Sequence, residues 1–300
     1  MNDRRDEQPP VGLDAFLSDD LAPAFWTPDL QIEDSRWQPH VPFAFWLAAA
    51  ARPRRLVELG TGRGVSYAAF CEAAARVGID AQFCAIDDWG DDRATGFLGD
   101  DAFNDFRDFH DRRYSRFSTL KRCAPETASP DFADGSIDLL HIDGARADDA
   151  AGDSFAAWRS RLSSRGLLLL HGTRLRDGET RVGRLFAEWR ERAPHFEFTH
   201  GDGLGLVCAG PEAPEVIAAL CRLQAADGDI FRARFEFLGA RWSERSIALN
   251  LIRQFDDDIQ SFRPRDQITR LPIRTRFARS ILKTLDDPLR HFRKGRRSAR

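Results

Sequence analysis

The chain has 300 residues, a formal net charge of −3, 42% hydrophobic residues and 30% charged residues, so it can bury a sizeable core and is neither wholly disordered nor fibrous. Its longest apolar stretch, Val41 to Ala51, is too short to cross a bilayer, and no secretory signal opens the sequence. We therefore expect a cytoplasmic protein of about two domains, in which the five cysteines are reduced and form neither a disulfide framework nor a zinc site.

Charge is distributed unevenly along the chain. Residues 263–300 contain 13 Lys/Arg and 3 Asp/Glu, a net charge of +10, which leaves −13 on residues 1–262. The acidic body argues against a nucleic-acid-binding core. The basic tail could meet phosphates, anionic lipid or an acidic polymer.

The first 35 residues are rich in proline and acidic side chains, which predicts a flexible amino-terminal arm with one helical turn near Leu13–Leu17. From residue 36 to 210, strand patterns alternate with helix patterns. The predicted strands are 56–59, 82–86, 136–142, 167–171, 196–199 and 204–208, and the predicted helices are 65–77, 101–112, 148–162 and 182–192. Such alternation is typical of a doubly wound α/β domain with a mostly parallel sheet, closed here by an antiparallel hairpin at its edge. Residues 211–262 read as a helical extension and 263–300 as a basic tail.

A glycine-rich turn follows the first predicted strand. Its sequence places Glu58 at the strand end and glycines at 60, 62 and 64, directly before the helix that starts at Val65. Glycines let the backbone bend sharply and let a ligand approach, and the helix amino terminus offers free N–H groups to an anion. The spacing is GxGxG, because Val65 stands where a dinucleotide fingerprint needs its third glycine, so an NAD-dependent oxidoreductase is the less favoured alternative.

This turn resembles the nucleotide-binding turn of class I S-adenosylmethionine (SAM)-dependent methyltransferases. The resemblance extends to one bacterial branch, the methyltransferase-24-like proteins, through the stretches 37–46, 57–67, 136–144 and 195–205. It implies a Rossmann-like fold, SAM as cofactor, and an acidic residue after the second strand that binds the ribose. The cofactor-binding residues that we expect are Glu58, Gly60, Thr61, Gly62, Ser66, Asp87 and Asp88.

The same resemblance implies an acceptor. Members of that branch often accompany glycosyltransferases of surface-polysaccharide synthesis, so we expect a small-molecule or glycan acceptor and a glycosyltransferase as a candidate partner. Methyl transfer to oxygen needs removal of the acceptor's proton, and Asp143 and His171 stand at strand ends where a base is needed. Asp143 could instead ligate a divalent metal, and His141 reads as a buried, hydrogen-bonded histidine rather than a second base.

Several positions depart from the family pattern on the acceptor side. Arg146 and Asp148 stand where a His and a Tyr are usual, Gly172 replaces an Asp, Asp202 replaces a His, and Ala94 replaces another His. Without a side chain at Gly172 a metal site lacks one ligand, so we predict no tightly held metal. Two hypotheses remain: an enzyme with a rearranged base, Asp143, His171 or Asp148, or a catalytically degenerate cofactor-binding or interaction subunit of a glycan assembly system.

The carboxyl-terminal third carries apolar residues at helical spacing. In 214–262 this pattern indicates packing against the domain, with a dimer contact as the alternative. In the tail, apolar residues alternate with basic ones, which predicts an amphipathic helix that could lie on an anionic membrane surface, remain solvated, or bind a partner. We expect no nucleic-acid binding, and the sequence leaves the oligomeric state open.

Overall fold

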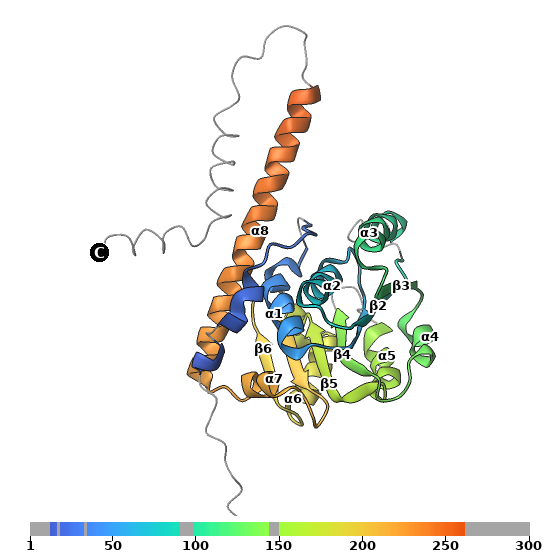
Figure 1. Ribbon diagram of the computed structural model, residues 1–300, viewed down its shortest axis with the longest axis vertical. Coiled ribbons are helices and arrows are strands. Elements are labelled where there is room, and N and C mark those ends of the chain that lie inside the picture. Colours follow the sequence, from blue (N-terminus) through green and yellow to red (C-terminus); the bar gives the residue numbers. More distant parts are fainter. Residues whose placement is uncertain (1–12, 17–18, 33–34, 91–98, 144–149, 262–300) are drawn as a thin grey trace, which may run out of the picture.

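The computed structural model describes residues 13–16, 19–32, 35–90, 99–143 and 150–261. Within these residues a seven-stranded sheet in the order β3-β2-β1-β4-β5-β7-β6 forms the centre of the molecule, with helices on both faces (Figure 1). Neighbouring strands are parallel except for β7, which is antiparallel to both β5 and β6. The predicted doubly wound α/β fold and its edge hairpin are confirmed.

The strands are β1 (Arg55–Leu59), β2 (Gln82–Asp87), β3 (Ser118–Arg122), β4 (Ile137–Asp143), β5 (Leu162–His171), β6 (His195–Phe198) and β7 (Leu204–Cys208). The helices are α1 (Val41–Ala51), α2 (Val65–Val77), α3 (Gly99–Tyr114), α4 (Pro125–Ala128), α5 (Ala150–Arg159), α6 (Arg181–Arg190), α7 (Glu215–Cys221) and α8 (Ala225–Ser261). Because the inner strands are covered on both faces, they are buried along most of their length rather than alternately buried and exposed.

Two hydrophobic clusters occupy the two faces of the sheet. Residues from α1, α2, α3, α7 and α8 pack on the first face, against side chains such as Leu56, Leu139 and Leu169. Residues from α5 and α6, among them Trp158 and Phe186, pack on the second face. Successive strand residues point to opposite faces, so Glu58, two residues after Leu56, also points toward α1 and α2.

Part of the predicted flexible arm packs against the domain. Residues 13–16 and 19–25 form 3-10 helices, and Phe16, Leu21 and Ala24 are buried in the first cluster. These apolar side chains pack against α1 and α8, so this part of the segment is ordered by contacts that span more than 200 residues of sequence. The description of residues 1–35 as a flexible arm is therefore wrong for residues 13–16 and 19–25.

Helix α1 and strand β3 are absent from the sequence prediction. Helix α1 is buried on nearly every side, and a helix that is apolar all round has no amphipathic stripe to reveal it. Strand β3 is an edge strand of polar composition, Ser-Thr-Leu-Lys-Arg, and lacks the apolar run that marks the other parallel strands.

Helix α8 is the longest described element. It packs Phe231, Phe235, Leu238 and Trp242 toward the domain and then continues past it as a projecting rod, drawn in orange in Figure 1. None of the described helices combines the length and the apolar composition needed to span a bilayer. The predicted amphipathic helix of the basic tail lies outside the described residues.

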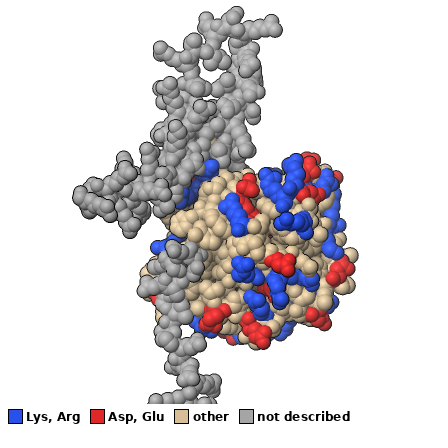
Figure 2. Space-filling model, in the orientation of Figure 1, with Lys and Arg blue, Asp and Glu red and all other residues tan. Residues whose placement is uncertain are grey.

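The side of the molecule shown in Figure 2 carries Lys/Arg and Asp/Glu side chains interspersed over its described surface. On this face the described residues form no broad patch of a single sign.

Candidate active site

The glycine turn lies at the carboxyl end of β1, where parallel sheets of this type bind ligands. Gly60, Gly62 and Gly64 have φ values of +85°, +55° and +83°, a backbone region that residues with a side chain rarely adopt. A Cβ on Gly60 would lie 2.9 Å from the backbone oxygen of Asp143, and a Cβ on Gly64 would overlap the ring of Phe106. The three glycines are therefore required by the turn itself and by its contacts with β4 and α3.

Asp87, at the end of β2, holds the middle of this turn. Its Oδ2 accepts a hydrogen bond from the Gly62 N–H at 2.8 Å, and its Oδ1 accepts one from the Trp89 N–H at 2.7 Å. The Trp89 indole Nε1 in turn donates to the Gly62 oxygen at 2.8 Å. These two backbone bonds orient the Asp87 carboxylate at the end of β2.

Glu58 lies beneath the turn in a buried chain of hydrogen bonds. The Trp37 Nε1–H donates to His141 Nε2 at 3.2 Å, and His141 Nδ1 lies 2.7 Å from Glu58 Oε2. Because an indole N–H can only donate, the His141 proton sits on Nδ1 and is donated to Glu58. Burial raises the pKa of the Glu58 carboxyl, and its interactions with His141 and Ser66 offset only part of that increase.

Two side-chain oxygens at this turn have no partner. Among the residues that the structure describes, Glu58 Oε1 and Thr61 Oγ1 are buried and make no hydrogen bond of normal geometry. Buried polar atoms in folded proteins are nearly always paired, with protein or with bound molecules. The two atoms therefore suit a ligand that brings donor groups to the turn, and the first turn of α2 beside them has no side-chain cap and no acidic residue.

Asp143 and His171 form a second pair, on the neighbouring strands β4 and β5. His171 Nδ1 lies 2.8 Å from Asp143 Oδ1, and His171 Nε2 lies 3.0 Å from the Gly201 oxygen. Both ring nitrogens face acceptors, so both carry protons and the ring is an imidazolium. Burial alone would lower the pKa of His171, but Asp143 and the Gly201 oxygen outweigh it and raise that pKa.

His40 and His200 extend this group of rings. His40 Nε2 donates to the same Gly201 oxygen at 3.0 Å, and the His40 and His200 rings stack with centroids 4.7 Å apart. Burial lowers the pKa of both, and for His40 the charged His171 lowers it further, to well below its ordinary value. A neutral His40 thus lies beside a charged His171, and both hydrogen-bond to the Gly201 oxygen in the turn before β7.

The positions that depart from the family pattern have partners within this chain. Gly172 has a φ of +92°, which an aspartate would adopt only with strain. Arg174 forms a two-bond fork with Glu197, at 2.8 and 2.7 Å, which links the end of β5 to β6. Asp202 pairs with Arg36 at 3.2 Å. Arg146, Asp148 and Ala94 lie outside the described residues.

The structure brings together most of the predicted cofactor residues. Gly62 donates to Asp87, and Gly60 and Thr61 belong to the same turn. Glu58 interacts with Ser66, in the first turn of α2. Asp88 is set apart: it is exposed and accepts a hydrogen bond from the N–H of Gly90 at 2.9 Å.

Sequence reasoning assigned no role to Trp37, His40, Trp89 or Phe106. Trp37 and His40 lie in the stretch 37–46, which carries part of the family resemblance, and Trp89 directly follows the two aspartates. Among the described residues no group of three or more His, Cys, Asp or Glu is arranged to hold a metal ion.

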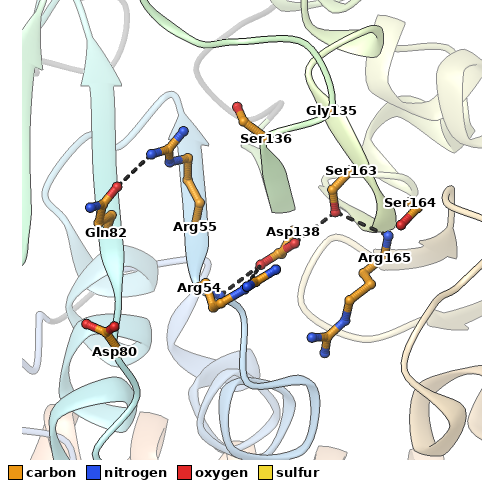
Figure 3. A pocket seen from close by; sticks show the side chains of 10 residues that line it. All are labelled: Arg54, Arg55, Asp80, Gln82, Gly135, Ser136, Asp138, Ser163, Ser164 and Arg165. Carbon is orange, nitrogen blue, oxygen red and sulfur yellow. Dashed lines mark hydrogen bonds and ion pairs between the residues drawn. The ribbon is translucent and has the colours of Figure 1, made fainter.

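A cavity of about 460 Å³ lies elsewhere, at the opposite end of the sheet. Figure 3 shows Arg54 and Arg55 at the start of β1 with Asp138 and Ser163 at the starts of β4 and β5. Asp138 is held by the Arg54 N–H at 2.9 Å and by the Ser163 hydroxyl at 2.8 Å. These hydrogen bonds connect the amino-terminal ends of β1, β4 and β5. None of the predicted site residues lines this cavity.

Residues 57–173 match the family model of a methyltransferase domain. The match is to a methyltransferase domain. It covers the glycine turn, the end of β2 and the ends of β4 and β5, which are the segments that form the site described above.

One curated relative, the uncharacterised protein y4gI of Sinorhizobium fredii, is 38% identical over 188 residues, which are 63% of this chain. The aligned part is 21% of that protein, so the chain spans about a fifth of the relative's length.

Solved structures similar to the chain include a methyltransferase of Geobacter sulfurreducens, at 21% identity and a TM-score of 0.43 over 66% of this chain and 96% of that one. Another is the S-adenosylhomocysteine-bound methyltransferase PaMTH1 of Podospora anserina, at 17% identity and a TM-score of 0.41 over 63% of this chain and 87% of that one.

The two ends of α2 offer a matched stability test. Gly64→Ala combines a strained φ with overlap of the Phe106 ring, so we expect it to lower the free energy of unfolding by about 2–4 kcal/mol. Gly78→Ala, at the other end, has a φ of +67° but open space around the new Cβ, so only the backbone cost of about 1 kcal/mol is expected. Urea unfolding of both variants measures the difference, and equal losses would contradict the packing of Phe106 on the turn.

Proposed function

We propose that this chain transfers a methyl group from SAM to a hydroxyl oxygen of a sugar or polysaccharide-related acceptor. The observation that supports it most is the glycine turn with its two unpartnered buried oxygens, Glu58 Oε1 and Thr61 Oγ1, beside the oriented carboxylate of Asp87. The match of residues 57–173 to a methyltransferase domain supports the methyl-transfer part of this proposal.

The residues present fit SAM. Glu58 and Thr61 provide acceptors for an ammonium group over the turn, the uncapped start of α2 suits a carboxylate, and Asp87 places a carboxylate, the group that binds ribose hydroxyls, at the end of β2. When bound, SAM supplies a sulfonium methyl that an oxygen can displace in line. The chain of bonds from Trp37 through His141 fixes the Glu58 carboxylate in one orientation for this purpose.

Asp143 is the better placed of the two candidate bases. It lies directly beside Gly60, and its side chain is 14% exposed, whereas the His171 side chain is 1% exposed and has protons on both nitrogens. Asp143 would accept the proton of the acceptor hydroxyl. His171 acts as a positioning residue, since its ring holds the Asp143 carboxylate through Oδ1.

The acceptor class is inferred from the resemblance to methyltransferase-24-like proteins, a branch that often accompanies glycosyltransferases. A sugar hydroxyl is a weak acid, so its methylation needs a base near the methyl donor. Asp143, next to the glycine turn, meets that requirement.

Two neighbouring aspartates test the cofactor site. Asp87→Asn would keep one acceptor oxygen but lose the charge and one of the two backbone bonds, so we expect SAM affinity to fall at least tenfold by isothermal titration calorimetry. Asp88→Asn, one residue along, is the matched control and should bind as the wild type does, because the Asp88 side chain is exposed and accepts its hydrogen bond from Gly90 rather than from the glycine turn. No SAM binding by the wild-type protein, or equal losses in both variants, would contradict the proposed site.

A second function is favoured by one specific observation. His171 has no free lone pair and Gly172 has no side chain, so the acceptor side offers fewer reactive groups than the cofactor side. A catalytically degenerate subunit of a glycan assembly system would bind SAM without turnover. Transfer of labelled methyl groups from SAM to a panel of sugars and extracted polysaccharides separates the two: any saturable incorporation supports the enzyme, and binding without incorporation supports the subunit.

A further inference from the structure

Helix α8 has two apolar faces, of which only one is used by the domain. The inner face carries Phe231, Phe235, Leu238 and Trp242, which are buried. The outer face carries large apolar side chains that are strongly exposed: Ile230 (51%), Phe237 (67%), Ile247 (51%) and Leu251 (45%). Large apolar side chains gathered on one exposed face mark an interaction surface.

The outer residues follow a heptad pattern. Positions 230, 237, 244 and 251 are seven residues apart, and positions 233, 240 and 247 repeat with the same spacing, three residues after the first series. Both series are exposed along their whole length. They correspond to the a and d positions of a coiled coil, and we call them the outer stripe: Ile230, Ala233, Phe237, Ala240, Glu244, Ile247 and Leu251.

The outer stripe lies on the side of α8 opposite the domain. At about 100° per residue, positions a and d are centred roughly 150–180° from the positions of Phe231, Phe235, Leu238 and Trp242. A partner helix can therefore lie along the stripe without meeting the domain. Figure 1 shows that the second part of α8 also extends past the sheet.

Charges beside the stripe indicate which partner fits. Asp229 and Glu236 occupy g positions, and Arg234 and Arg241 occupy e positions. In a parallel pair of helices a g residue meets the e residue five positions further along the partner, so Glu236 would meet the partner subunit's Arg241. An antiparallel pair would place acids against acids and arginines against arginines.

We propose that the outer stripe of α8 binds the same stripe of a second copy of this chain, in a parallel two-fold dimer. The stripe is apolar except at Glu244, and the flanking charges match only when both helices run in the same direction. The two-fold axis then runs between the helices, and the two domains lie on the outer sides of the pair.

Glu244 limits the strength of this dimer. It occupies an a position, so a parallel pair brings it next to Glu244 of the partner subunit, and two adjacent carboxylates repel each other. A polar residue at an a position sets register at a cost in stability. Glu244→Leu should therefore tighten the dimer at least tenfold.

The oligomeric state of the full-length protein tests the proposal. Sedimentation velocity over a concentration series should show a monomer–dimer equilibrium, and Phe237→Glu should raise the dimer dissociation constant at least tenfold. Phe25→Glu is the control, because Phe25 is also an exposed aromatic residue (48%) but lies outside α8. Circular dichroism of each variant checks that the fold is retained.

A charge exchange tests the parallel direction. Glu236→Arg and Arg241→Glu should each weaken the dimer severalfold, and the double variant should recover most of the wild-type affinity. A wild-type chain that stays monomeric over the whole concentration series would overturn the proposal. This holds even if a variant lacking residues 262–300 dimerises, because the stripe would then be covered by the chain itself in the full-length protein. A dimer insensitive to Phe237→Glu would overturn it as well, and a double variant weaker than either single one would overturn the parallel arrangement.

Discussion

Asp143→Asn is expected to slow methyl transfer by about 10²–10⁴-fold, the range for loss of a general base, while SAM affinity stays within about threefold of the wild type. The amide oxygen can still accept the Nδ1–H of His171, so the side chain keeps its place, but it can no longer take a proton. The rate is measured as incorporation of labelled methyl groups into the acceptor found by the sugar panel, and the affinity by calorimetry.

His171→Gln is the companion variant for this prediction. It retains a donor toward Asp143 but removes the positive charge. Because His171 is a positioning residue, the expected decrease in the rate of methyl transfer is smaller, about tenfold. If Asp143→Asn keeps more than half of the wild-type rate, Asp143 is not the base. If His171→Gln is the slower of the two, the roles of the pair are exchanged.

His141→Leu is expected to lower the free energy of unfolding by about 3–5 kcal/mol, because it leaves a fully buried carboxylate and a buried indole N–H without partners. Glu58→Gln should cost less than about 1 kcal/mol, since the amide oxygen still accepts the His141 Nδ1–H and the buried charge is gone. Urea unfolding at pH 7 measures both values.

The two variants also differ in what they do to the site. Glu58→Gln folds normally but removes the anionic acceptor beneath the turn, so SAM affinity should fall at least tenfold. A large loss of stability in Glu58→Gln, or a loss below about 1 kcal/mol in His141→Leu, would contradict the buried chain from Trp37 to Glu58.

Much of the fold follows from local patterns in the sequence. The α2 prediction, 65–77, agrees with the observed helix, and strands β1, β2, β4, β6 and β7 lie within a residue or two of their predicted bounds. Strand β5 begins at Leu162, before its predicted start at Leu167. The prediction missed this first part because Ser163, Ser164 and Arg165 are polar and carry no strand signal. Helix α1 and the packed part of the first 35 residues depend on contacts between distant segments, which periodicity does not report.

The site divides in the same way. The glycine turn and Asp87 are predictable, because a local spacing and two strand ends specify them. Trp37 is 104 residues from the histidine to which it donates, and no local pattern indicates that pairing. The imidazolium state of His171 likewise depends on the Gly201 oxygen, 30 residues away. The sequence therefore indicates His171 as a candidate base but does not show that both of its ring nitrogens are protonated.

A crystal structure of the chain grown with S-adenosylhomocysteine tests the central claim most directly. The proposed function predicts density for the ligand at the carboxyl ends of β1 and β2, with the ribose hydroxyls within hydrogen-bond distance of Asp87 and the amino-acid end over Gly60–Gly62. Density at any other place, or no ligand density at the glycine turn at millimolar ligand, would contradict it.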